Sequence, residues 1–220
     1  MAAKGKARLA PRMDVESLTE NFREQVERGT VFEALAVGMA LPSLESLRGQ
    51  PVRIDQSLLR GVTLSGAPDG TRAERLVMAD VRVEGSDLSN LDMSEGRLER
   101  VEFVETRLTG ANLRDVRLKS VLFQECKLDL AMLRMARFEA CVFERCRLTE
   151  ADFYGADLSG VVFRGCDLGR ADLSQARLGG ADLRDCRLDG MRGMPAEMNG
   201  LMISPDQAAL LITLFGVKVG

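Results

Sequence analysis

The chain has 220 residues, a formal net charge of −3, and neither histidine nor tryptophan. A charge this close to zero gives no bulk electrostatic preference for nucleic acid or for an anionic membrane, so neither is an expected partner. No apolar run approaches the roughly 20 residues that a membrane-spanning helix needs.

The first 50 residues predict a tail followed by a helical cap. Residues 1–13 are basic and contain no acidic side chain, which is typical of a disordered terminus. Residues 15–28 carry an apolar stripe at helical spacing. Thr30-Val31-Phe32-Glu33 has the form of a capping box and predicts a second, short helix that Pro42 ends. Residues 14–50 are therefore expected to form an N-terminal helical cap.

A short internal repeat dominates the chain. From Leu88 to Leu188 a large apolar residue occupies every fifth position, and a small residue nearly always lies two positions before it. Neither a helix nor a flat strand has this period, whereas a solenoid does. A period of twenty sorts the aromatic and thiol side chains onto different sides, so four units are expected to form one coil. These residues are Phe103, Phe123, Phe143 and Phe163 on one side, and Cys126, Cys146, Cys166 and Cys186 on another.

The repeat begins before Leu88, and its first part is out of frame with the rest. Ile54, Leu59 and Leu64 are spaced by five, and Met78 and Val83 fall in the main frame. We expect a repeat domain over residues 51–190, with a turn-rich loop at 66–75 leaving the coil. Loops on rigid scaffolds often carry function. The loop therefore supplies candidate partner-binding residues, namely Gly66, Pro68, Asp69, Gly70 and Arg72.

Units such as Ala151-Asp152-Phe153 and Ala181-Asp182-Leu183 resemble the pentapeptide repeat family. The resemblance implies an all-β solenoid, a right-handed four-sided (quadrilateral) β-helix. Several bacterial members bind DNA gyrase or topoisomerase IV and protect them from poisons, with a rod thought to imitate duplex DNA. The resemblance therefore implies that this chain is a DNA-mimic-like protein that protects gyrase. Acids on the side of Phe103, namely Glu102, Glu105 and Glu125, are then candidate partner-binding residues.

The four predicted sides of the coil differ in net charge. The sides of Met93 and Phe103 are acidic, so DNA mimicry would use these two sides. The side of Leu98 is basic through Arg97, Arg100, Arg117, Lys119, Arg137 and Arg177.

A second interpretation is a structural or scaffold protein that binds another cytoplasmic partner. Outward positions near the middle of the repeat, normally polar, hold apolar side chains, and such patches often mark interfaces. We predict a mid-rod apolar patch of Leu122, Leu130, Met132, Met135 and Val142.

Residues 191–220 are expected to cap the C-terminal end of the rod. Ser204-Pro205-Asp206 is a strong helix start, and the following helix is apolar on almost every side. Similar C-terminal helices join family members into end-to-end dimers, so the resemblance implies a homodimer. The candidate dimerisation residues are Leu210, Leu211, Leu214 and Phe215.

The sequence offers little for catalysis. Histidine is missing, the five cysteines occupy inward positions, and no pocket is expected between paired acids such as Asp182 and Asp185. We predict no enzyme activity, no metal and no cofactor. Reduced thiols, and the lack of a recognisable signal peptide, predict a cytoplasmic protein.

Overall fold

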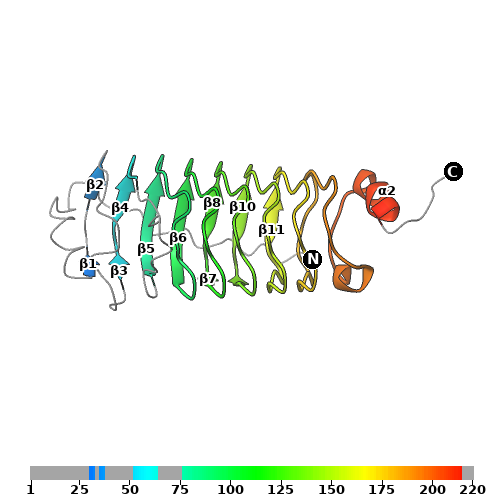
Figure 1. Cartoon of the computed structure of the whole chain (residues 1–220), viewed down its shortest axis with the longest axis horizontal. Coiled ribbons are helices and arrows are strands. Elements are labelled where there is room, and N and C mark those ends of the chain that lie inside the picture. The colour runs from blue at the N-terminus through cyan, green and yellow to red at the C-terminus, as the bar shows by residue number, and fades with distance from the viewer. Residues whose placement is uncertain (1–29, 33–34, 38–51, 64–75, 215–220) are drawn as a thin grey trace, which may run out of the picture.

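The computed structural model describes residues 30–32, 35–37, 52–63 and 76–214. Within these ranges the chain winds into a right-handed, four-sided β-helix, whose coils stack along one axis and end beside helix α2 (Figure 1). The predicted all-β solenoid is confirmed. Every strand pair is parallel, because each coil returns above the previous one in the same direction.

The regular elements are short, as expected for a coil that turns at every fifth residue. The strands are β1 (Thr30–Phe32), β2 (Leu35–Val37), β3 (Arg53–Asp55), β4 (Leu58–Arg60), β5 (Val77–Glu84), β6 (Arg97–Val104), β7 (Arg117–Lys119), β8 (Leu122–Gln124), β9 (Arg137–Glu139), β10 (Val142–Glu144) and β11 (Val162–Arg164). A 3-10 helix, η3 (Pro195–Met198), and the α-helix α2 (Pro205–Leu214) follow.

The register explains the change of frame. Phe123 pairs with Phe143, which lies one regular period further along the chain. Ile54 pairs instead with Met78, which lies four positions beyond that period. The extra residues precede Leu76, in the region predicted to leave the coil. The loop candidates Gly66, Pro68, Asp69, Gly70 and Arg72 lie outside the described residues.

The predicted second N-terminal helix is wrong. Thr30–Phe32 and Leu35–Val37 are strands β1 and β2, which pair with β3 and β4. Val31 and Ala36 are spaced by five and match Ile54 and Leu59 in register. Pairing with the next coil of the repeat therefore outweighs the local capping-box signal. The predicted tail and first helix lie outside the described residues.

The core consists of stacked, inward-facing side chains. The rings of Phe103, Phe123, Phe143 and Phe163 lie nearly parallel, with successive centroids 5.0, 4.6 and 4.8 Å apart. These spacings match the strand separation of about 4.8 Å. The predicted aromatic stack is confirmed, and the four rings are at most 1% exposed.

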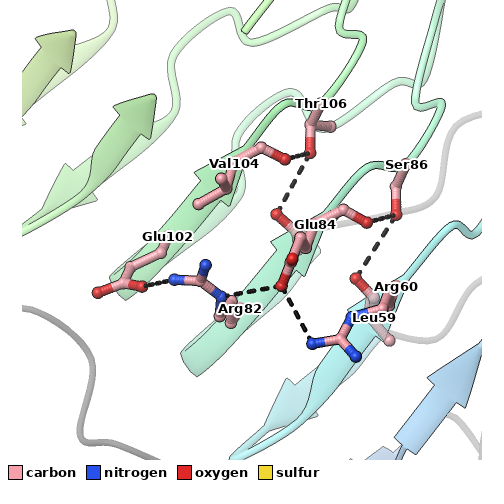
Figure 2. Close-up of polar contacts among 9 residues, drawn as sticks. Leu59, Arg60, Arg82, Glu84, Ser86, Glu102, Val104 and Thr106 are labelled. Atoms are coloured by element: carbon pink, nitrogen blue, oxygen red, sulfur yellow. Dashed lines mark hydrogen bonds and ion pairs between the residues drawn. The ribbon is translucent and has the colours of Figure 1, made fainter. Parts of the chain in front are cut away.

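A second inward column consists of small hydrogen-bond donors. The hydroxyl of Thr106 lies 3.0 Å from the carbonyl of Val104 and 3.2 Å from that of Val83 in the coil before (Figure 2). Ser86 occupies the equivalent place one coil earlier, and Cys126, Cys146 and Cys166 continue the column with their thiols. The cysteines thus fill space and also satisfy carbonyl groups.

Two of the buried thiols, Cys146 in this column and Cys141 on another side of the coil, have a raised pKa. Burial raises the pKa of Cys141 to about 11, and the neighbouring thiol of Cys126 is the main cause that raises the pKa of Cys146 to about 12. Because the thiolate is the reactive form, both side chains stay protonated and unreactive near neutral pH.

Helix α2 closes the donor column. The side-chain nitrogen of Gln207 donates to the carbonyls of Leu183 and Cys186, at 2.8 and 2.6 Å. It takes the position that the next Ser, Thr or Cys would occupy if the coil continued. The side-chain oxygen of Gln207 also accepts the backbone N–H of Ser204 at the helix start. One side chain therefore joins the helix to the last coil.

Candidate functional site

Four outer faces surround a filled core. We name the faces after four consecutive large inward residues, as the Leu88, Met93, Leu98 and Phe103 faces. Along the main frame the large inward residues are at most 6% exposed. A binding partner can therefore contact only the outward side chains, which stack in columns at the strand spacing.

Ion pairs between neighbouring coils cover much of this surface. Arg82 contacts Glu102 of the next coil and Glu84 of its own, and Arg60 reaches Glu84 from the coil before (Figure 2). Burial alone would raise the pKa of Glu84, but its contacts with the two arginines outweigh burial and hold the pKa below its usual value.

The same arrangement recurs along the rod between equivalent positions of neighbouring coils. The pairs are Arg100–Asp80, Arg107–Asp87, Lys119–Glu139, Arg145–Glu125, Arg164–Glu144, Arg170–Glu150, Arg177–Asp157, Arg187–Asp167 and Arg192–Asp172. Exposed pairs of this kind contribute little stability each. Their main consequence is that most acids of the rod lie beside a positive charge.

The three candidate acids do not form one open acidic surface. Glu102 is only 7% exposed and pairs with Arg82, and Glu125 pairs with Arg145. Glu105 lies at an exposed corner and, within the described residues, forms no ion pair. The Phe103 face therefore offers less negative charge than its acids alone indicate.

The predicted apolar patch is divided between two faces. Leu130, Met132 and Met135 are 55, 38 and 48% exposed and cross the Met93 face within one coil. We call these three residues the apolar band. Leu122 and Val142 instead lie half-buried in β8 and β10 on the Phe103 face, on the other side of the Leu98 face. The prediction of a single patch is therefore wrong.

Local geometry holds the apolar band in place. Leu130 and Met135 occupy corners with φ of 59° and 56°, a conformation that few non-glycine residues adopt. A Cβ atom at Gly155 would lie 2.6 Å from the sulfur of Met135, so the glycine leaves room for this side chain. Beside the band, the guanidinium of Arg134 lies 4.5 Å from the ring centre of Tyr154.

The Leu98 face carries a column of stacked basic residues, as the Leu88 face does with Arg107, Lys127 and Arg147. Arg97, Arg117 and Arg137 are paired in register on β6, β7 and β9, so like charges stack on three successive coils. Unit charges about 4 Å apart repel by about 1 kcal/mol in water, and by more near a protein surface. The sequence indicated a basic side, but the net charge of the side did not reveal that Arg97 and Arg117 have no acid in register on a neighbouring coil, whereas Arg137 has Asp157.

The C-terminal candidates are also divided. Leu211 is 5% exposed and packs on the core of its own chain, and Leu210 packs beside it. The side chains of Leu214 and Phe215 lie outside the described part of the chain. Ile212, within the helix predicted to be apolar on almost every side, is 42% exposed, and sequence reasoning missed Met194 and Met202, which are 63 and 43% exposed.

The described residues contain neither a candidate metal centre nor a candidate membrane-spanning helix. In that part of the chain, no group of three or more His, Cys, Asp or Glu side chains is placed to hold a metal ion. None of its helices combines the length and the apolar character that crossing a membrane requires.

Family models match most of the main repeat. The model for pentapeptide repeats matches residues 82–119, and the model for the pentapeptide repeat region matches residues 136–204. No curated protein matches the chain by sequence.

Solved structures of pentapeptide repeat proteins are also similar. HetL from the cyanobacterium Nostoc sp. strain PCC 7120, described as involved in heterocyst differentiation regulation, is 21% identical; the match covers 79% of this chain and 89% of HetL, with a TM-score of 0.36. Full-length QnrB1, a plasmid-mediated fluoroquinolone resistance protein, is 18% identical over 86% of this chain and 99% of QnrB1, with a TM-score of 0.31. With its five-residue repeat, its four-sided coils and both family models in agreement, the chain belongs to the pentapeptide repeat family.

Proposed function

We propose that the chain is a non-enzymatic, cytoplasmic rod that works by binding a protein partner through its outer faces. The apolar band of Leu130, Met132 and Met135 carries this proposal. Its side chains are 38–55% exposed on a surface otherwise dominated by ion pairs. Exposing them to water is unfavourable, and a partner that covered them would recover the free energy of burial.

We propose a bacterial type II topoisomerase, DNA gyrase or topoisomerase IV, as the partner, with protection against topoisomerase poisons as the result. The pentapeptide repeat supports this choice, because some bacterial members of the family protect these enzymes. A scaffold that binds another cytoplasmic protein through the same band is the second candidate.

The charge pattern favours apolar contact over close DNA mimicry. A DNA segment as long as five coils, roughly 25 Å, carries about 15 negative charges. In contrast, Glu102 and Glu125 are each paired with an arginine from a neighbouring coil. We therefore expect a topoisomerase to contact the band, with exposed acids such as Glu105 contributing a smaller, salt-dependent part.

Substitution of the apolar band tests this proposal. Leu130→Asn, Met132→Ser and Met135→Asn together should weaken binding to purified gyrase at least tenfold, measured by biolayer interferometry. Asparagine tolerates the positive φ of the two corners, so the coil should stay intact. The matched control, Leu122→Thr with Val142→Thr on the Phe103 face, should change the affinity less than threefold.

The other outcomes separate the candidates. A Glu105→Lys, Glu125→Lys variant that lost more affinity than the band variant, with full competition by duplex DNA, would favour mimicry instead. If the wild-type chain bound no gyrase or topoisomerase IV at micromolar concentration, the topoisomerase proposal would be rejected and the scaffold candidate would stand.

We also propose that the chain forms a homodimer through its C-terminal end. Ile212 is exposed on α2, and Met194 and Met202 are exposed in the segment before it. Ile212→Glu should give a monomer with an unchanged melting temperature, as measured by light scattering and circular dichroism. Leu211→Glu is the contrasting variant: it should lower the melting temperature, because Leu211 is buried in its own chain. A wild-type monomer at high concentration would contradict the dimer.

A further inference from the structure

The arginine column on the Leu98 face differs from the other column of stacked like charges, Arg107, Lys127 and Arg147 on the Leu88 face, whose two arginines pair with Asp87 and Asp129. In the Leu98 column, Arg117 meets Arg97 on one side and Arg137 on the other. Within the described residues, Arg97 and Arg117 form no ion pair. The next residue along the column, Asp157, is in register with Arg137 and lies 3.8 Å from Arg177, so it is not a neighbour of Arg97 or Arg117.

These arginines line a groove. A surface groove of about 1170 Å³ follows the corner between the Met93 and Leu98 faces. Arg97, Arg117 and Arg137 form one wall, and Glu95, Asp115 and Met135 form the other. All six side chains are exposed. The groove therefore has a basic wall facing a wall that is acidic for two coils and apolar at the third.

We infer that this groove binds an extended, acidic peptide segment whose carboxylates, at every second residue, face Arg97, Arg117 and Arg137. Guanidinium groups bind carboxylates through paired hydrogen bonds, and a bound carboxylate removes the repulsion between stacked arginines. The inference rests on the proposed protein-binding role. It does not depend on a topoisomerase being the partner.

The spacing of an extended chain fits the groove. Alternate side chains of an extended peptide are about 6.7 Å apart, and strands of the rod are about 4.8 Å apart. Arginine side chains are long, and mutual repulsion spreads their charged ends towards the wider spacing. The intervening side chains of the peptide face the opposite wall. A hydroxyl donor suits the carboxylate of Asp115, and an apolar residue suits Met135.

Nucleic acid fits the same groove less well. A phosphate backbone is negative along its whole length, so Asp115 on the opposite wall would repel it. The formal net charge of the chain, −3, gives no long-range attraction for a polyanion. A peptide can present carboxylates to one wall and neutral donors to the other, and is therefore the favoured ligand.

Fluorescence anisotropy with the full chain tests the inference. The probe is a labelled peptide, Leu-Glu-Ser-Glu-Ser-Glu-Leu, which presents the same pattern in either direction. We expect it to bind in 50 mM salt at least tenfold more tightly than Leu-Ser-Glu-Glu-Glu-Ser-Leu, which has the same composition. Arg97→Gln, Arg117→Gln and Arg137→Gln together should weaken binding at least tenfold.

A matched triple variant controls for charge. Arg145→Gln, Arg164→Gln and Arg187→Gln remove the same charge from arginines that are paired on other faces. This variant should keep the affinity for the probe within threefold. Thermal melting gives a second contrast, because removing stacked like charges should not lower the melting temperature, whereas removing paired arginines should lower it.

Any of the following results would contradict the inference. Equal losses in the two triple variants, or equal affinity for the two peptides, would mean non-specific attraction. Tighter binding of a short single-stranded oligonucleotide with three phosphates would make the groove a nucleic-acid site. If the probe failed to bind at 1 mM while gyrase still bound the rod, the inference about the groove would be rejected, and the proposed binding of a topoisomerase would remain.

Discussion

Replacing Phe143 with alanine is expected to lower the free energy of unfolding by about 3–5 kcal/mol. The ring is completely buried and lies between Phe123 and Phe163, with centroid distances of 4.6 and 4.8 Å. Phe138 of the adjacent face packs against it at 6.0 Å. Removing the ring leaves a cavity that stacked coils cannot close, because each backbone is bonded above and below. Chemical denaturation followed by circular dichroism measures the change.

Phe143→Leu is the matched control. The aromatic column itself ends with leucine, since Leu183 occupies this position in the last full coil and is 1% exposed. Leucine retains most of the buried apolar volume, so we expect a cost of roughly 1 kcal/mol. A denaturation midpoint that Phe143→Ala left unchanged would contradict the stacked core.

Replacing Gln207 with methionine is expected to cost about 2–4 kcal/mol, because two buried carbonyls lose their donor. The side chain of Gln207 is 7% exposed and donates to Leu183 and Cys186, and its oxygen accepts the N–H of Ser204. Methionine has a similar size and helix propensity but cannot donate to a carbonyl. Thermal melting should show the loss, and hydrogen exchange should locate it in the last coil.

Thr213→Ala on the same helix is the control. Its hydroxyl is exposed and bonds only to carbonyls of its own helix, at Ala209 and Leu210. We expect a change of less than about 0.5 kcal/mol. If the two substitutions had equal effects, Gln207 would not be the residue that closes the column.

The repeat made the fold predictable, because burial requires an inward residue in every unit. Phe143 and its neighbours could be assigned to one column from the period of twenty alone. The helix predicted at Thr30 failed because a local capping signal competed with pairing to Arg53 and the rest of β3, a full coil further along the chain. No local pattern reports such distant pairing.

The candidate site was less predictable, for two physical reasons. Leu122 and Leu130 lie close in sequence but on different faces, so proximity along the chain gave a false patch. The charges of Glu102 and Arg82 are neutralised across coils, which a sum over one face does not capture. The burial of Leu211 depends on how α2 sits on the last coil, and the apolar pattern of the helix does not determine this.

Gyrase activity in the presence of a quinolone tests the proposed role most directly. Supercoiling of relaxed plasmid should be measured across drug concentrations, with the wild-type chain and with the variant of the apolar band. We expect the wild-type chain to raise the inhibitory drug concentration several-fold and the variant to have little effect. The proposed protection would be contradicted if the wild-type chain, at molar excess over gyrases from several bacteria, left the inhibitory drug concentration unchanged.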